Sequence, residues 1–177
     1  QINTGPFGST IHKKDYIENG VPIINPIHIK DCRINPSFDI TVSNEKADEL
    51  KRYRLIKDDI VLARRGEMGR AAKVTEKEEG YLCGTGSMFI RIKNKELHPD
   101  FLVLTLSSPA IIQYLNSFSV GSTMININQR IVSGLEILDC KLDEQQEIVR
   151  RTEGLLELAD KIEARFIRAQ EYVNKLT

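Results

Sequence analysis

The stretch from Leu142 to Thr177 constrains the fold of this chain more than any other. From Ile148 onward, positions facing one side recur at alternating steps of four and three residues, and only Thr152 among them is polar. The full set is Ile148, Thr152, Leu155, Ala159, Ile162, Phe166, Ala169, Val173 and Leu176. An apolar seam with this mean spacing stays on one side of a helix only if the helix supercoils against a partner. The pattern therefore predicts one long coiled-coil-type helix, roughly 50 Å in length.

An amphipathic helix lying on its own globular core is the commoner explanation of such a stripe. Here the residues before Leu142 are too few to cover every turn of so long a helix. No Gly or Pro stop signal follows Leu176, and the chain begins at Gln1 instead of Met. We therefore expect a fragment that ends within the helix. We divide it into a globular domain, residues 1–140, and a helical region, residues 141–177.

Composition narrows the choice of partners and compartment. The chain has 177 residues with 25 basic and 25 acidic side chains, so any nucleic-acid surface must be a local patch. The three cysteines Cys32, Cys83 and Cys140 are far apart and lack metal-ligand spacing. They favour free thiols in a reducing, cytoplasmic compartment. Neither a signal peptide nor a membrane-length apolar run is present.

Strand and helix patterns alternate without a regular βαβ rhythm, which predicts an α+β fold. We expect helices over residues 12–18, from Ser43 or Asn44 to about 53, from Pro99 to 106, past Pro109 to about 116, and over 131–135. We expect strands over residues 21–29 (edge or kinked, because of its two prolines), 40–42, 59–65, 70–75, 87–92 and 137–140. Glycines at 66 and 69 predict that the strands over 59–65 and 70–75 form a hairpin.

Three catalytic interpretations fail on their residues. Asn35-Pro-Ser-Phe is similar to a base-gripping methyltransferase loop, but a second Pro and a Gly-rich turn for the methyl donor are missing. Asp100 with Asp139 and Lys141 imitates a metal-dependent nuclease, yet Asp100 falls at a helix start, where an acid is simply favourable. The histidines are scattered, with no nucleophile near them. We predict no active site and no metal site.

Two loops carry side chains suited to nucleic acid, and a third spot is weaker. The first surrounds the hairpin tip with Arg64, Arg65 and Arg70, whose forks suit phosphate or guanine; a solvated charged turn is the alternative. The second loop contains Ser122, Thr123, Asn126, Asn128 and Gln129. The third spot consists of Lys13 and Lys14. Hydroxyls and amides of the second loop can reach phosphate or adenine, or merely cap the helix that follows. Lys13 and Lys14 fit equally an ordinary helix surface.

With these pieces in place, the chain resembles one half of the specificity subunit of type I restriction–modification enzymes. The resemblance is carried, in order, by Gly5-Pro-Phe-Gly-Ser, Asp15-Tyr with Gly20-Val-Pro-Ile-Ile-Asn-Pro, Asp58-Asp-Ile-Val-Leu-Ala-Arg-Arg-Gly, Gly84-Thr-Gly-Ser-Met-Phe-Ile-Arg, Gly121-Ser-Thr-Met-Ile-Asn-Ile-Asn-Gln and Leu142-Asp-Glu-Gln-Gln-Glu-Ile-Val. The last is the most diagnostic, because that family begins its spacer helix with Leu-x-Glu-Gln.

The resemblance implies a non-catalytic subunit that reads one half of a split double-stranded DNA target. It implies that the loop residues above contact DNA and that the spacer helix pairs with a second half or with another copy. It also implies docking of methyltransferase subunits and of restriction and motor subunits. The methyl donor, ATP and Mg²⁺ would belong to those partners and not to this chain. A rival hypothesis is a coiled-coil scaffold whose globular part binds protein, and a third is a nuclease or methyltransferase in its own right.

Overall fold

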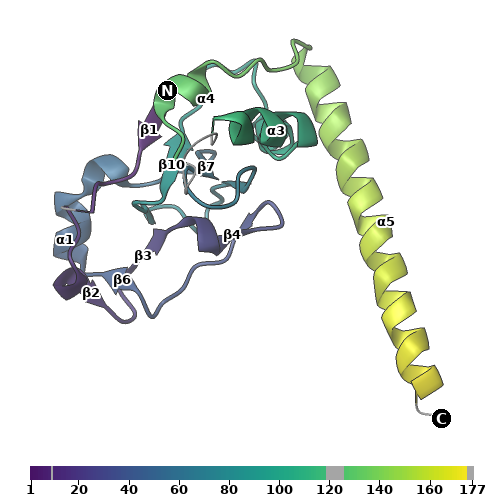
Figure 1. Cartoon of the computed structure of the whole chain (residues 1–177), viewed down its shortest axis with the longest axis horizontal. Helices are drawn as coiled ribbons and strands as arrows, with labels where there is room; N and C mark the ends of the chain where they lie inside the picture. The colour runs from purple at the N-terminus through teal and green to yellow at the C-terminus, as the bar shows by residue number, and fades with distance from the viewer. Residues whose placement is uncertain (9, 119–125, 175–177) are drawn as a thin grey trace. The chain divides into compact units, whose positions relative to one another are not determined.

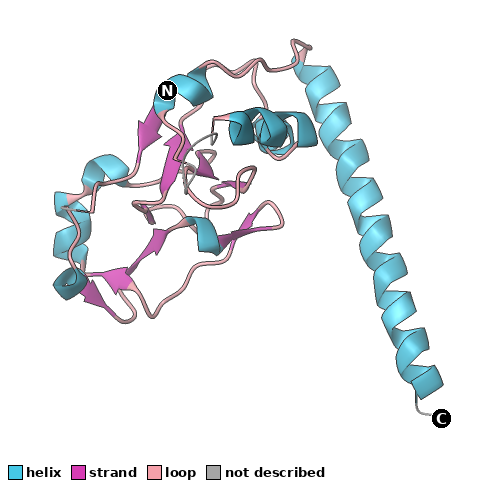
Figure 2. Cartoon of the chain, viewed as in Figure 1, coloured by secondary structure: helices cyan, strands magenta, loops and turns pink. Residues whose placement is uncertain are grey.

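The structure is a computed structural model that describes residues 1–8, 10–118 and 126–174. The chain separates into two compact units, residues 1–139 and residues 140–177 (Figure 1). The first unit mixes sheets and helices, and the second is a single long helix, as the colours of Figure 2 show. The mixed α+β class with a long C-terminal helix is thus confirmed.

A four-stranded antiparallel sheet forms the centre of the first unit, in the order β1-β10-β7-β8. Its strands are β1 (Ile2–Thr4), β10 (Ser87–Ile90), β7 (Ile60–Ala63) and β8 (Ala71–Lys73). Side chains alternate across β7, so Ile60 and Leu62 join one hydrophobic cluster while Val61 joins another. Both faces of the sheet are therefore covered, which explains why every residue of β7 is apolar and buried.

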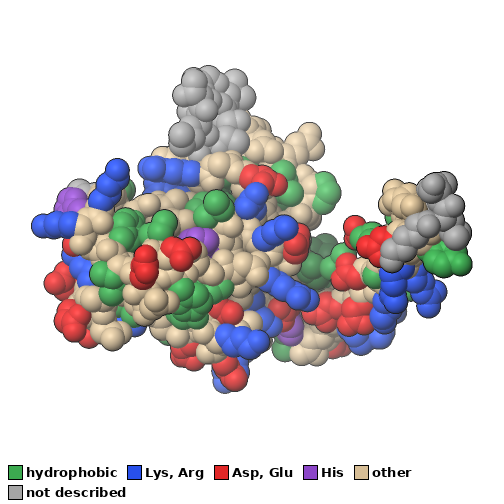
Figure 3. Space-filling model, turned by 90° about the horizontal axis from the view of Figure 1, so that it is seen from below, with side chains coloured by type: hydrophobic (Ala, Val, Ile, Leu, Met, Phe, Trp, Pro, Cys, Tyr) green, Lys and Arg blue, Asp and Glu red, His purple; other side chains and the backbone are tan. Residues whose placement is uncertain are grey.

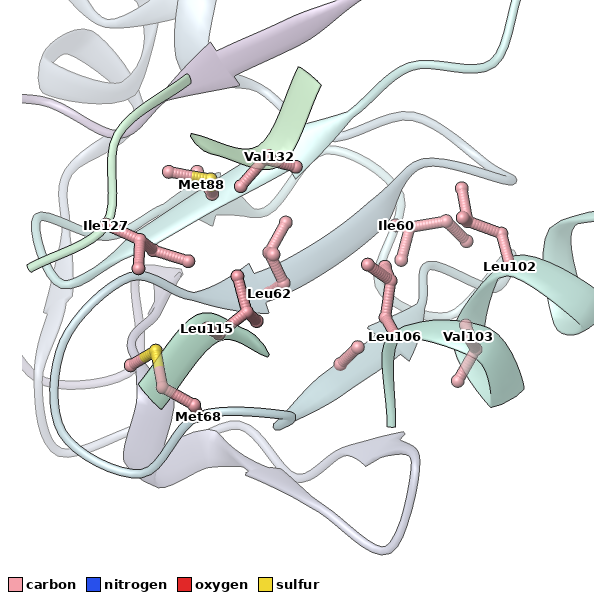
Figure 4. Packing of buried hydrophobic residues seen from close by; sticks show 11 residues of the cluster. Ile60, Leu62, Met68, Met88, Leu102, Val103, Leu106, Leu115, Ile127 and Val132 are labelled. Atoms are coloured by element: carbon pink, nitrogen blue, oxygen red, sulfur yellow. The ribbon is translucent and has the colours of Figure 1, made fainter. Parts of the chain in front are cut away.

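Three helices cover one face of this sheet. They are α2 (Pro99–Leu106), α3 (Pro109–Ser117) and α4 (Gln129–Ser133). Pro99 and Pro109 stand in the first turn of their helices, where a missing N–H costs nothing. Figure 4 shows Leu106 of α2, Leu115 of α3 and Val132 of α4 packing with residues of the sheet. These helices confirm the segments predicted from the two prolines and, within two residues at each end, the short helix over 131–135.

A second set of short strands follows the order β2-β6-β3-β9. The strands are β2 (Tyr16–Ile17), β6 (Thr41–Val42), β3 (Val21–Ile24) and β9 (Leu82–Cys83). The halves of β3 have different partners: Val21 and Pro22 pair with β6, whereas Ile23 and Ile24 pair with β9. The partner changes directly after Pro22, which has no N–H to donate to a ladder. The sequence predicted an edge or kinked strand; each half of β3 is paired on one side only, and the strand ends at Ile24.

The segment expected as one strand over residues 21–29 is interrupted after β3. A short 3₁₀ helix, η2 (Pro26–His28), leads into a two-stranded hairpin that the sequence pattern did not predict. The hairpin consists of β4 (Ile29–Lys30) and β5 (Arg33–Ile34), with Ile29 opposite Ile34 and Lys30 opposite Arg33. Its two turn residues, Asp31 and Cys32, both have positive φ angles, of 50° and 56°.

Three other elements differ from, or refine, the expectations. The helix over residues 12–18 is a single 3₁₀ turn, η1 (Lys13–Asp15), followed directly by β2. The expected strand over residues 137–140 is not formed: this segment has no regular secondary structure and no partner strand among the described residues. The helix capped by Ser43 is confirmed as α1 (Asn44–Glu49), where the Ser43 side chain accepts a hydrogen bond from the Lys46 N–H, and η3 (Lys51–Tyr53) continues it.

The second unit contains helix α5 (Leu142–Asn174). Glu147 pairs with Arg150 and Arg151, and hydrogen bonds from these arginines lower the pKa of the Glu147 carboxyl to about 2. Leu155, Ile162 and Phe166 of the seam are 68%, 59% and 66% exposed, and Ala159 and Ala169 are exposed as well. The Val173 side chain and Leu176 lie outside the described residues. Within the described ranges, no helix combines the length and apolarity that a membrane span requires.

Candidate nucleic-acid interface

Backbone hydrogen bonds and a buried side chain hold the tip of the β7–β8 hairpin in place. Ala63 donates a hydrogen bond to the Arg70 carbonyl at 2.9 Å, and the Arg64 N–H donates to the Gly86 carbonyl at 3.0 Å. Gly66 and Gly69 adopt positive φ angles of 78° and 85°, a region that glycine enters without steric cost. Between them Met68 is only 4% exposed and packs into the hydrophobic cluster beneath the helices. The tip is therefore held at its base and from within.

Arg64 points into the protein and joins the two predicted binding loops. Its side chain is 7% exposed, and its Nε and Nη2 donate to the Asn126 Oδ1 at 3.2 and 3.0 Å. Arg65 and Asn126 also form an isolated antiparallel bridge, and the Ile127 N–H donates to the Arg64 carbonyl at 2.9 Å. Burial lowers the pKa of the Arg64 guanidinium, and the neighbouring charge of Arg65 adds to this effect. The end of the second loop is thus fastened alongside the hairpin.

Arg70 is likewise engaged by the protein. Its Nε donates to the Glu67 Oε2 at 2.9 Å, and its Nη1 donates to the carbonyls of Pro26 and Ile29 at 3.4 and 3.3 Å. Arg65, in contrast, is exposed, and its guanidinium has no hydrogen-bond or ion-pair partner within the described part of the chain. Of the three arginines at the hairpin, Arg65 is the one whose fork remains available to a ligand.

The remaining predicted residues fall into three groups. Ser122 and Thr123 lie outside the described residues. Asn128 is the N-cap of α4, where its Oδ1 accepts from the Ile131 N–H at 3.1 Å, while the exposed Gln129 donates to the Thr4 Oγ1 at 3.2 Å. The capping role considered for this loop is therefore present at Asn128. Lys13 and Lys14 are exposed on η1, an element that precedes the second set of strands.

The surface shows no extended field of one charge on the face in view. Blue Lys and Arg side chains are interspersed with red Asp and Glu side chains over the first unit (Figure 3). Among the described residues, no group of three His, Cys, Asp or Glu side chains is arranged to hold a metal ion. On this face, contact with DNA would therefore depend on individual basic side chains and not on a continuous basic patch.

The amino-acid sequence matches a known family along almost the whole chain. The model of the type I restriction modification DNA specificity domain matches residues 6–169. The chain belongs to this family. The EcoBI specificity subunit of Escherichia coli is 29% identical over 92% of this chain and 34% of its own length. The StySPI specificity subunit of Salmonella potsdam is 36% identical over 73% of this chain and 29% of its own length. The chain thus spans about a third of these type I restriction enzyme subunits.

Solved structures support the same fold. One match comes from structural work on complex assembly and conformational transition of the type I R-M system. It superposes on this chain with a TM-score of 0.67 at 16% sequence identity. That comparison covers 99% of this specificity-domain chain and 40% of the other. The HsdS subunit of Thermoanaerobacter tengcongensis gives a TM-score of 0.64 at 17% identity, over 91% and 36% of the two chains. At these identities the likeness concerns the fold alone.

The contact between Arg64 and Asn126 leads to a testable expectation for this specificity domain. Arg64→Met keeps the aliphatic stem and removes the charged donors, and Asn126→Ala removes the acceptor. Because the two side chains bond each other, their effects on the free energy of unfolding should be non-additive by about 1–2 kcal/mol. Denaturant unfolding of both single variants and the double variant measures this coupling. Arg65→Ala is the control, expected within about 0.5 kcal/mol of wild type; strictly additive effects would contradict the contact.

Proposed function

We propose that this chain binds DNA sequence-specifically, as the part of a type I specificity subunit that reads one half of a bipartite target. The observation that carries the proposal is the match to the DNA specificity domain family, which runs through both the globular unit and the helix. The hairpin geometry supports it, because a two-stranded ribbon fits the major groove of B-DNA. In this proposal β7 and β8 bring the tip to the base edges.

Arg65 has the leading role at that tip. Its exposed guanidinium carries a fork of donors that matches the two acceptors on the major-groove edge of guanine. Arg64 and Asn126 position the two loops relative to each other, and Arg70 fixes the hairpin against η2. Gln129, together with Ser122 and Thr123, remains a proposed DNA contact, whereas Asn128 acts through the helix it caps.

The helix supports a proposal about partners. At 100° per residue, Leu155, Ile162 and Phe166 lie within a narrow stripe. The exposed Leu158 and Tyr172 extend this stripe on one flank, and the exposed Leu156 and Ile167 extend it on the other. A stripe this wide exceeds what one paired helix covers, since a coiled-coil seam is narrower. We assign the centre to a second spacer helix, from another half or another copy, and the flanks to helices of methyltransferase subunits.

The chain itself carries out no reaction in this proposal. The methyl donor would be bound by the methyltransferase subunits, and ATP and Mg²⁺ by the restriction and motor subunits. A second candidate function, a scaffold whose globular part binds protein, is favoured by Phe7 and Ile27, which are 66% and 78% exposed. Selection from random duplexes distinguishes the two, because a protein-binding scaffold would enrich no DNA motif.

Replacement of Arg65 tests the role of the hairpin tip. Arg65→Ala should weaken binding to the preferred duplex by about 1–3 kcal/mol and relax the preference at one base pair. Arg65→Lys keeps the charge but loses the two-pronged fork, so it should retain non-specific binding while losing the same preference. Competition assays with duplexes altered at single positions measure both effects. An equal loss on every sequence would show a phosphate contact instead of base recognition.

A further inference from the structure

The β4–β5 hairpin is built as a firmly anchored projection. Ile29 and Ile34, opposite each other in the register, are 1% and 8% exposed and belong to the hydrophobic cluster that also contains Phe89. The Asn35 N–H donates to the His28 carbonyl at 2.7 Å and closes the base of the hairpin. Lys30 and Arg33, the next pair outward, are both exposed. The apolar pair thus fixes the direction of the basic pair.

Two features of this hairpin are unfavourable for the isolated chain. Asp31 and Cys32 occupy the left-handed region, with φ angles of 50° and 56°, although neither is glycine. Lys30 stands directly opposite Arg33, and like charges in facing positions repel. Neither the Lys30 nor the Arg33 side chain has an ion-pair or hydrogen-bond partner in the described ranges of the structure. The hairpin thus presents two neighbouring cations, an arrangement that a bound anion would stabilise.

The hairpin adjoins the β7–β8 tip. Arg70, whose backbone begins the return strand of that tip, donates through Nη1 to the Ile29 carbonyl. On the far side, the Cys32 Sγ lies 3.7 Å from the Ser107 Oγ, which in turn donates to the Gly69 carbonyl at 2.9 Å. Both ends of the β4–β5 hairpin are therefore tied to the turn that presents Arg65. The two hairpin tips therefore belong to one connected part of the first unit.

We propose that Lys30 and Arg33 bind backbone phosphates of the duplex whose bases the β7–β8 tip contacts. This inference rests on the proposed function and adds to it a positioning element outside the loops selected from the sequence. Phosphates bound by the two cations offset their mutual repulsion, and each such contact releases condensed counterions from the DNA. Contacts of this kind set the register of a protein on a duplex and carry no base preference.

The salt dependence of binding provides the test. Each phosphate contact contributes about 0.9 to the slope of log K against log salt, so Lys30→Ala and Arg33→Ala should each lower the slope by about that amount. At about 0.15 M salt, this corresponds to roughly fivefold weaker binding for each variant. The loss should be equal on a mixed-sequence duplex and on the preferred duplex. Because a like-charge pair is relieved, the denaturation midpoint of either variant should not fall below that of wild type.

Lys77→Ala is the matched control. Lys77 is exposed and follows β8, whose last residue Lys73 pairs with Ile60 at the end of the sheet opposite the tip. For Lys77→Ala, the slope of log K against log salt should equal that of wild type. Slopes for Lys30→Ala and Arg33→Ala that equal the Lys77→Ala slope would overturn the inference while leaving the role of Arg65 intact. A loss confined to one sequence would also overturn it. If the wild-type chain binds no duplex at any salt concentration, the proposed function fails, and this inference fails with it.

Discussion

Replacing Leu155 and Ile162 together by glutamate is expected to abolish association of the chain through α5. Both side chains are large, apolar and more than half exposed, at 68% and 59%. Burial of each against a partner helix is worth about 1.5–3 kcal/mol. In a symmetric pair every position counts twice, so the loss amounts to about 6–12 kcal/mol before the repulsion between the new charges is included. Sedimentation should show a dimer for wild type and a monomer for the double variant.

The control is Ala164→Glu, which places the same charge on the opposite face of α5, where it should leave the dimer intact. A wild-type chain that sediments as a monomer at high concentration would contradict pairing between copies. It would leave a second recognition half as the remaining partner for the seam. Circular dichroism of each variant confirms that the helix persists, because glutamate is a good helix former.

Asp59→Asn should lower the free energy of unfolding by about 3 kcal/mol, the lower end of the range for breaking a buried ion pair. Asp59 is 1% exposed, and its carboxylate accepts from the Arg91 Nε and Nη2 at 2.9 and 2.7 Å and from the Ile56 N–H at 3.0 Å. Asparagine keeps the shape but leaves the Arg91 guanidinium, which lies over the Phe89 ring, without its counter-charge. Denaturant unfolding provides the measurement.

Asp58→Asn is the neighbouring isosteric control. Asp58 is exposed and has a positive φ angle of 66°, a conformation that asparagine also tolerates. Its stability should stay within about 0.5 kcal/mol of wild type. If both variants unfold at the same denaturant concentration, the pair between Asp59 and Arg91 does not hold the base of β7 in place.

Local chemistry in the sequence was enough to predict part of this fold. Gly66 and Gly69 marked the β7–β8 turn, Ser43 marked the start of α1, and the spacing of four and three residues marked α5. The β4–β5 hairpin escaped because Asp31 and Cys32 form its turn without a glycine. Its signal, two isoleucines flanking a basic pair across two residues, is visible only once a two-residue loop is assumed.

The candidate site was harder to predict, because its arrangement depends on contacts between distant residues. Arg64 and Arg65 are neighbours with the same side chain, and the Arg64 side chain is buried in contact with Asn126, 62 residues away, while Arg65 is exposed. The same applies to Arg70, whose carbonyl partners on Pro26 and Ile29 come from a different part of the chain. Residue type indicated the class of ligand for all three arginines, whereas tertiary packing decided which of them remains available.

Selection of bound duplexes from a random pool shows whether the chain reads a DNA sequence. We expect the wild-type chain to enrich one short motif, and Arg65→Ala to enrich the same motif with one base pair no longer specified. We also expect Lys30→Ala and Arg33→Ala to enrich the full motif, with weaker binding overall. A pool in which no motif is enriched, even at low salt and with an adenine methyltransferase subunit present, would contradict the claim that this chain reads DNA sequence.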